Sequence, residues 1–212
     1  MWFIKTLDLY LKMLSGKHEC EFLIAMDTDD PSMCNDVMAD YLDQIDFPPD
    51  SKTKLTWYWK DHKGKVEAVN SCISSHEFDI VVAISDDVEP QEQGYDDVIV
   101  TSMLSVFPDL NGIIYFDDGR CHQKVVSIPM IGRPMFNQIG YITHPDFIAW
   151  GDDFTTPNLK ATGKLAYFDH VLLKHTWRRY GCDDTYNQAA AYRHVDKETY
   201  KRLMQEHKEI NP

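Results

Sequence analysis

Short apolar runs that end in aspartate alternate along this sequence with segments of helical periodicity. The runs occupy residues 22–26, 80–84 and 112–116, and an acidic residue follows each of them within two positions. An uninterrupted apolar run of this length is typical of a strand that is buried on both faces. Strands that alternate with helices indicate an α/β fold, in which helices flank a mainly parallel sheet.

Helical spacing of apolar residues covers the segments between these runs. It predicts helices at 2–14, 33–45, 65–73 and 95–107, and β-forming residues predict a further strand at 55–59. In the second helix the expected buried face carries Met33, Val37, Tyr41 and Ile45. After residue 120 the pattern loosens and ends in a helical tail from about Asp196. The stretch 132–141, with His144 and Pro145 beyond it, has the composition of a mobile loop.

The charge and the cysteines exclude several classes of protein. A formal net charge of −13 argues against binding to nucleic acid, which depends on Lys and Arg that displace counterions. No apolar run approaches the roughly 18 residues of a membrane-spanning helix, so we expect no integral membrane segment. The five cysteines are odd in number, widely spaced and contain no CxxC motif. They predict reduced thiols in a cytoplasmic protein rather than a disulfide or zinc scaffold.

The acidic residues are mostly aspartate, and twelve of them form six adjacent pairs. The pairs are 29–30, 86–87, 96–97, 117–118, 152–153 and 183–184. Three pairs directly follow an expected strand, so they should gather at the edge of the sheet where ligands bind. Clustered carboxylates favour a divalent cation that holds a polyanion such as a diphosphate. The alternative is ordinary turn chemistry. We expect 96–97 and 183–184 to be structural, and 117–118 fits either interpretation.

Five motifs in order resemble the GT-A glycosyltransferases, especially the inverting family-two-like enzymes. They are Phe22–Ser32 (FLIAMDTDDPS), Gly64–Asn70 (GKVEAVN), Ser85-Asp86-Asp87 after its strand, Trp150–Phe154 (WGDDF) and Leu172–His175 (LLKH). The resemblance spans about residues 20–190. It implies a single domain over 1–212. Residues 1–120 would bind the nucleotide sugar, 121–195 would form the acceptor and catalytic part, and 196–212 would be a C-terminal helix.

The resemblance implies where the donor, a nucleotide-diphospho-sugar linked to UDP or GDP, would bind. Asp27 and Asp29 would face the nucleobase and ribose. Lys65, near a helix N-terminus, would stabilise the base edge or the phosphates, although a solvated lysine is an equal alternative. Asp86 would contact the ribose or support the metal.

The same resemblance implies a metal site. Asp87 would ligate Mn²⁺ or Mg²⁺ that bridges the diphosphate, and His175 would be a further ligand. A lone histidine is more often structural, so the expectation for His175 depends on its place in the ordered set of motifs.

Sugar transfer to an acceptor hydroxyl requires a base that takes the hydroxyl proton. Asp152 and Asp153 are the candidates, and we favour Asp152. A base at this position implies direct displacement with inversion of the anomeric centre. The alternative for either residue is N-capping of a helix ahead of Phe154. The acceptor would be a glycan or another hydroxyl compound, and aromatic residues such as Trp150 and Tyr141 could stack on it or simply pack in the core.

One departure from the family concerns the N-terminus. The family begins with a strand that ends in a proline, whereas this sequence begins in the following helix at Trp2. We therefore expect the first strand to be missing, which exposes a sheet edge and favours a second hypothesis. In that hypothesis the domain binds a nucleotide sugar or glycan without catalysis. A nucleotidyltransferase is disfavoured because the sequence has no Gly/Arg/Lys-rich loop near its start. Donor sugar, base, acceptor and oligomeric state are not specified by the sequence.

Overall fold

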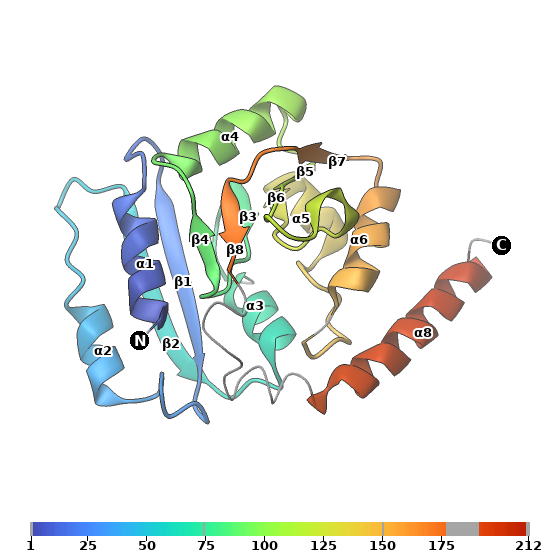
Figure 1. Ribbon diagram of the computed structural model, residues 1–212, viewed down its shortest axis with the longest axis horizontal. Helices are drawn as coiled ribbons and strands as arrows, with labels where there is room; N and C mark the ends of the chain where they lie inside the picture. The colour runs from blue at the N-terminus through green and yellow to red at the C-terminus, as the bar shows by residue number, and fades with distance from the viewer. Residues whose placement is uncertain (1, 74, 150, 177–190, 211–212) are drawn as a thin grey trace.

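The computed structural model describes residues 2–73, 75–149, 151–176 and 191–210 (Figure 1). Its helices are α1 (Trp2–Lys12), α2 (Asp36–Asp43), α3 (Lys65–Ile73), α4 (Tyr95–Val106), α5 (Arg133–Ile139), α6 (Asp152–Ala161) and α8 (Arg193–Ile210), with a 3₁₀ turn, η1, at His122–Lys124. Its strands are β1 (Cys20–Asp27), β2 (Thr53–Lys60), β3 (Ile80–Val82), β4 (Val88–Pro90), β5 (Ile113–Phe116), β6 (Met130–Gly132), β7 (Leu165–Phe168) and β8 (Leu173–His175).

The strands pair in both directions. A four-stranded sheet has the order β3-β6-β5-β7, in which β5 and β7 are parallel and β6 is antiparallel to both of its neighbours. β1 and β2 pair in parallel along their whole length, and β4 and β8 form a short antiparallel pair. The expected α/β class is confirmed. The longer pairings are parallel, and the antiparallel ones involve short strands.

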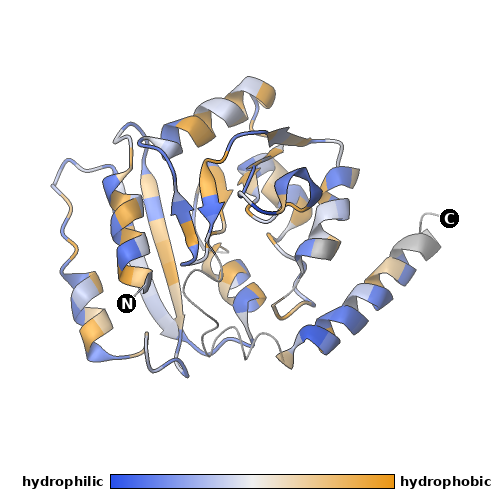
Figure 2. Ribbon diagram, viewed as in Figure 1, coloured by the Kyte–Doolittle hydropathy of each residue, from blue (hydrophilic) through white to orange (hydrophobic). Residues whose placement is uncertain are grey.

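Strand β5 shows how the core is divided. Its four residues are all buried, and successive side chains point to opposite faces of a strand. Ile114 packs in one apolar cluster with Met103 of α4, whereas Ile113 packs in another with Met135 of α5. Helices therefore cover both faces of β5, as its uninterrupted apolar run predicts. Figure 2 shows apolar residues concentrated along β1 and β3, whereas α8 is largely polar.

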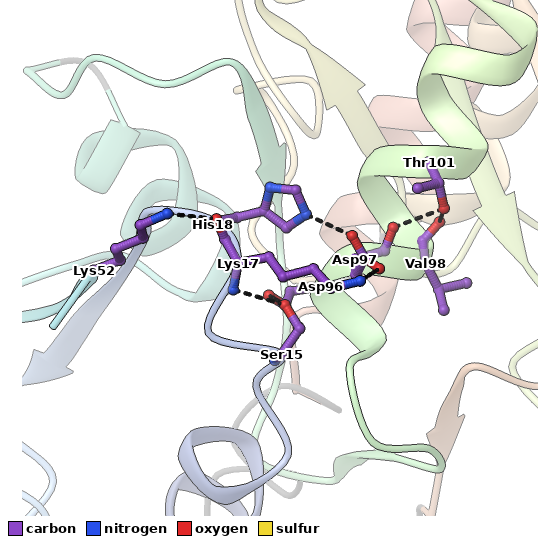
Figure 3. Close-up of polar contacts among 8 residues, drawn as sticks. All are labelled: Ser15, Lys17, His18, Lys52, Asp96, Asp97, Val98 and Thr101. Atoms are coloured by element: carbon purple, nitrogen blue, oxygen red, sulfur yellow. Dashed lines mark hydrogen bonds and ion pairs between the residues drawn. The ribbon is translucent and has the colours of Figure 1, made fainter.

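Figure 3 shows how the turn after α1 is fastened to the start of α4. The carboxylate of Asp96 accepts hydrogen bonds from the main-chain N–H and the hydroxyl of Ser15, at 2.7 and 2.6 Å. Hydrogen bonds from Lys17 and then His18 lower the pKa of Asp97. Both carboxylates also lie in the first turn of α4, where they interact favourably with the helix dipole. The structural interpretation of this pair is confirmed.

Two expectations about local structure are wrong. The stretch 132–141 is not a loop, because it contains the end of β6 and all of α5. A proline in its first turn and Gly140 at its C-cap, with φ of 82°, give this helix a standard beginning and end. In α2, Val37 is 76% exposed, and Met38 and Leu42 are buried instead. Met33, Tyr41 and Ile45 pack against the same cluster as expected, so Val37 alone departs from the predicted face.

Two further expectations concern membrane-spanning helices and the cysteines. Within the described ranges no helix is both long and apolar enough to cross a membrane. Cys20, Cys34, Cys72 and Cys121 are free thiols. Cys182 and the pair Asp183–Asp184 lie outside the described residues.

Candidate functional site

Strands β4 and β8 place an aspartate next to a histidine. Val88 of β4 is in register with His175 of β8, so Asp87 lies beside the end of β8. Nε2 of His175 is 2.9 Å from Oδ2 of Asp87. The hydroxyl of Ser85 donates to Oδ1 of Asp87 at 2.5 Å, and the N–H of Thr176 donates to the Asp87 carbonyl at 2.7 Å. The structure therefore brings together the two residues predicted to bind metal.

The surroundings of Asp87 favour its charged form. Burial by itself raises the pKa of this carboxyl, but hydrogen bonds from His175 and Ser85 and the charges of His175 and Lys65 outweigh burial and lower it. Asp87 is consequently held as a carboxylate, which is the form that binds a cation. The contribution of Lys65 also shows that the lysine of the GKVEAVN motif lies within electrostatic reach of this pair.

A small pocket of about 60 Å³ joins several of the predicted residues. It is lined by Lys65, Val66, Val69, Ala83, Ile84, Ser85, Val88, Val126, Ser127, Ile128, Pro129, Ile142, Thr143, Ala149, Asp152, Thr155 and His175. Lys65, Asp152 and His175 come from three different sequence motifs and meet here. A more open hollow of about 470 Å³ elsewhere, lined by residues such as Tyr115, Lys124 and Tyr167, contains none of the predicted residues.

The start of α6 defines the position of the candidate base. Gly151 is the N-cap residue, and its carbonyl accepts the N–H of Phe154 at 3.1 Å and that of Thr155 at 2.8 Å. Asp152 is the first helical residue rather than the cap, so the N-cap alternative is wrong for this pair. Asp152 lines the pocket. The side chain of Asp153 lies outside the described part of the chain.

Asn70 of α3 anchors another part of the pocket wall. Its side-chain amide donates to the carbonyl of Thr143 at 2.8 Å and accepts the N–H of Ile142 at 3.0 Å. Both of these residues line the pocket. The sequence indicated Asn70 only as the last letter of a motif, and its contacts explain why an amide, which both donates and accepts, suits this position.

The pair 117–118 is structural. Asp118 is 1% exposed, and it accepts hydrogen bonds from the N–H groups of Arg120 and Cys121 and from the hydroxyl of Ser127. Asp117 accepts the N–H of Gly119 at 2.7 Å. These contacts organise the turn after β5, and they place Ser127 in the wall of the pocket.

The remaining predicted residues lie outside this pocket. Asp27 ends β1, and its Oδ1 lies 2.6 Å from Nδ1 of His62, whose side chain is fully buried. Nε2 of His62 is 3.3 Å from the hydroxyl of Ser71 in α3. Asp29 and Asp86 are exposed. Asp27, Asp29 and Asp86 are thus absent from the pocket lining, although Asp86 directly follows Ser85, which lines it. The contact between Asp27 and His62 was not expected from the sequence.

The side chains of Asp87 and His175, next to the β4–β8 pair, partly suit a divalent metal. Asp87 offers a carboxylate and His175 an imidazole nitrogen, and Mn²⁺ accepts both. Among the described residues there is no group of three or more His, Cys, Asp or Glu side chains arranged to hold a metal ion. A metal at this pair would take its other ligands from substrate phosphates and water, as Mg²⁺ commonly does in phosphate-binding sites.

Comparisons with known proteins agree with the fold. The structure is similar to the mannosyltransferase PcManGT from Pyrobaculum calidifontis, solved in complex with GDP-Man and Mn²⁺, with a TM-score of 0.51 and 12% sequence identity. The match covers 85% of this chain and 65% of the mannosyltransferase, so the chain spans less than two thirds of that protein. No protein-family model matches the sequence, and no curated protein matches it. The likeness shows a glycosyltransferase-like fold.

Proposed function

We propose that this chain is a metal-dependent glycosyltransferase that moves a sugar from a nucleotide-diphospho-sugar to an acceptor hydroxyl with inversion. The observation that carries this proposal is the meeting of Asp152, Lys65 and His175 at one pocket, with Asp87 hydrogen-bonded to His175. A carboxylate, an ammonium group and an imidazole thus line one pocket, and these are the groups that the proposed transfer would use. The proposed division of the domain agrees with this, because Asp87 comes from the part before residue 121 and His175 and Asp152 from the part after it.

In this proposal Asp152 takes the proton of the acceptor hydroxyl while the hydroxyl oxygen attacks the anomeric carbon of the donor sugar. The bond from that carbon to the phosphate oxygen breaks, and the nucleoside diphosphate leaves with the electron pair. Asp87 and His175 would hold Mn²⁺ or Mg²⁺, and the ion would supply positive charge to neutralise the leaving diphosphate. Lys65, which lines the same pocket, would add positive charge there. Direct displacement of this kind inverts the anomeric centre.

The nucleotide would lie outside this pocket. A volume of about 60 Å³ accommodates the reacting groups rather than a whole nucleotide sugar. The exposed Asp86 and the carboxylates of Asp27 and Asp29 are therefore proposed to contact the ribose and the base. GDP-Man, the ligand named for the mannosyltransferase, is the first donor to test, and UDP-linked sugars are the second. A cytoplasmic location stays a prediction from the free cysteines.

Donor turnover tests this proposal. The protein would be incubated with GDP-mannose, UDP-glucose and related donors, with Mn²⁺ or with EDTA, and release of GDP or UDP would be measured. We expect release with at least one donor, in Mn²⁺ only. The Asp109→Asn variant is a control, because Asp109 lies outside the described pocket lining. Metal-independent release, or no release with any donor, would overturn the proposal.

A further inference from the structure

A buried carboxylate of helix α8 contacts the backbone at the wall of the candidate pocket. Asp196 is 2% exposed, although it belongs to a helix that is largely polar. Its two oxygens accept hydrogen bonds from the main-chain N–H groups of Ile148, at 2.8 Å, and Ala149, at 3.0 Å. Ala149 lines the pocket, and Asp152 begins α6 three residues later. The carboxylate thus holds the backbone that leads into the candidate base.

The start of α3 and the residue before it also contact this backbone. The carbonyl of Ile148 accepts the N–H of Val66 at 3.1 Å. Gly64 approaches so closely that an added Cβ would lie 2.8 Å from the same carbonyl oxygen. Segment 148–149 is therefore fixed between Asp196 and the beginning of the helix that carries Lys65. Because Asp196 and the start of α3 both contact Ile148, a change at Asp196 can reach Lys65 and Asp152 together.

Other contacts attach α8 independently of Asp196. Leu203 packs with Val66, Phe147 and Phe154 in an apolar cluster, and Arg202 contacts Asp146 at 2.6 Å. Removing one carboxylate therefore leaves the helix docked. The consequence should be local, because the contacts of the Asp196 carboxylate with described residues include two amides of one short segment, whereas the apolar contacts of α8 come from other residues.

We propose that Asp196 is a positioning residue of the candidate active site. It acts through the 148–149 backbone to fix Asp152 relative to Lys65 and His175. The kinetic consequence of this inference rests on the proposed function, whereas its structural consequence does not. A misplacement of reacting groups by about 1 Å costs on the order of 100-fold in rate, so a loosened 148–149 segment should slow transfer without weakening donor binding.

The test compares three variants of the full chain. Asp196→Ala removes both acceptor oxygens, Asp196→Asn keeps one, and Glu198→Gln changes an exposed acid on the same helix. Hydrogen exchange would be followed at the amides of Ile148, Ala149 and Val66. The kcat and KM for GDP-mannose and UDP-glucose would be measured with Mn²⁺, together with the affinity for GDP and UDP.

In Asp196→Ala we expect exchange at Ile148 and Ala149 to become at least about tenfold faster, while the buried amides of β5 keep their protection. We expect kcat to fall by about 10- to 100-fold with KM and nucleotide affinity changed less than about twofold. Asp196→Asn should lie between Asp196→Ala and the wild type, and Glu198→Gln should match the wild type.

Two results of the exchange measurement would overturn the inference. One is wild-type exchange at Ile148 and Ala149 in Asp196→Ala. The other is a loss of β5 protection that matches the loss at 148–149, which would show a general loss of stability. Both results can be read even if the wild type turns over no donor, which is the result that would instead overturn the proposed function. With an active wild type, an unchanged kcat in Asp196→Ala would also overturn the inference.

Discussion

Nε2 of His175 lies 2.9 Å from Oδ2 of Asp87, although the two residues are 88 positions apart in the sequence. The antiparallel register of β4 and β8 creates this contact, because it pairs Val88 with His175. The N–H of His175 also donates to the carbonyl of Asp118 at 2.9 Å. The turn after β5, which Asp118 organises, therefore supports the histidine. His175 is thus fixed at the end of β8, and Asp87 lies in the turn directly before β4, where its carbonyl accepts the N–H of Thr176.

The Asp152→Asn substitution should slow turnover strongly without affecting nucleotide binding. Asp152→Asn keeps the shape of the side chain and removes its ability to accept a proton, and loss of a general base lowers kcat by about 10²- to 10⁴-fold. Donor turnover and calorimetric affinity for GDP or UDP would be measured on the same preparation. Asp153→Asn is the matched comparison and should keep most activity. Full activity in Asp152→Asn would contradict the assignment, and a large loss in Asp153→Asn alone would transfer it to Asp153.

Two adjacent threonines of α6 should respond differently to replacement by valine. The hydroxyl of Thr156 accepts the N–H of Val126 at 3.0 Å, and Val126 is 1% exposed. The hydroxyl of Thr155 is buried without a hydrogen-bond partner among the described residues. Thr156→Val should therefore lower the free energy of unfolding by about 1–3 kcal/mol, whereas Thr155→Val should leave it unchanged or raise it. Urea unfolding would measure both. Equal destabilisation by the two variants would contradict this reading of the helix.

His144 should make stability depend on pH below neutrality. Burial, more than the charge of Arg202, lowers the pKa of His144 below its ordinary value of 6.5, and the charge of Asp146 opposes this shift only in part. Between the folded and unfolded pKa values the unfolded chain binds the extra proton, so stability rises with pH in that window. The contribution is complete above about pH 6.5 and is lost as the pH falls.

The His144→Gln variant tests this dependence, because glutamine does not titrate. Unfolding midpoints between pH 7.5 and 5 should fall less steeply for His144→Gln than for the wild type. His194→Gln is a control, since His194 is exposed. Parallel pH profiles for His144→Gln and the wild type would contradict the prediction.

Most of the helices and strands can be predicted from the sequence, because they depend on local patterns. The apolar run that became β5 and the spacing that became α4 each specify a buried face. Helix α5 was not predicted, because its glycine, proline and aromatic residues suggested a loop. A proline in the first turn and Gly140 after the last are signals of a helix start and end that were present in the sequence.

The candidate site was predictable only in part. The sequence motifs indicated Asp87 and His175 as metal ligands, and the fold brings the two side chains into contact. The partners of Asp27 and the role of Asp196 depend on contacts between distant segments, such as His62 with Asp27 across 35 positions. A single buried acid in a polar helix carries no periodic signal. Contacts of this kind become visible only when the strands and helices are placed in space.

Calorimetric titration of GDP and UDP with Mn²⁺ and with EDTA tests the proposed metal-dependent site most directly. The wild type should bind one of the two nucleotides in Mn²⁺. The affinity should fall at least about tenfold when EDTA replaces the metal or when Asp87 is changed to Asn. Asp97→Asn, which alters an acid at the start of α4 instead, should bind like the wild type. Equal affinity with and without Mn²⁺, or no binding of either nucleotide, would contradict the proposal.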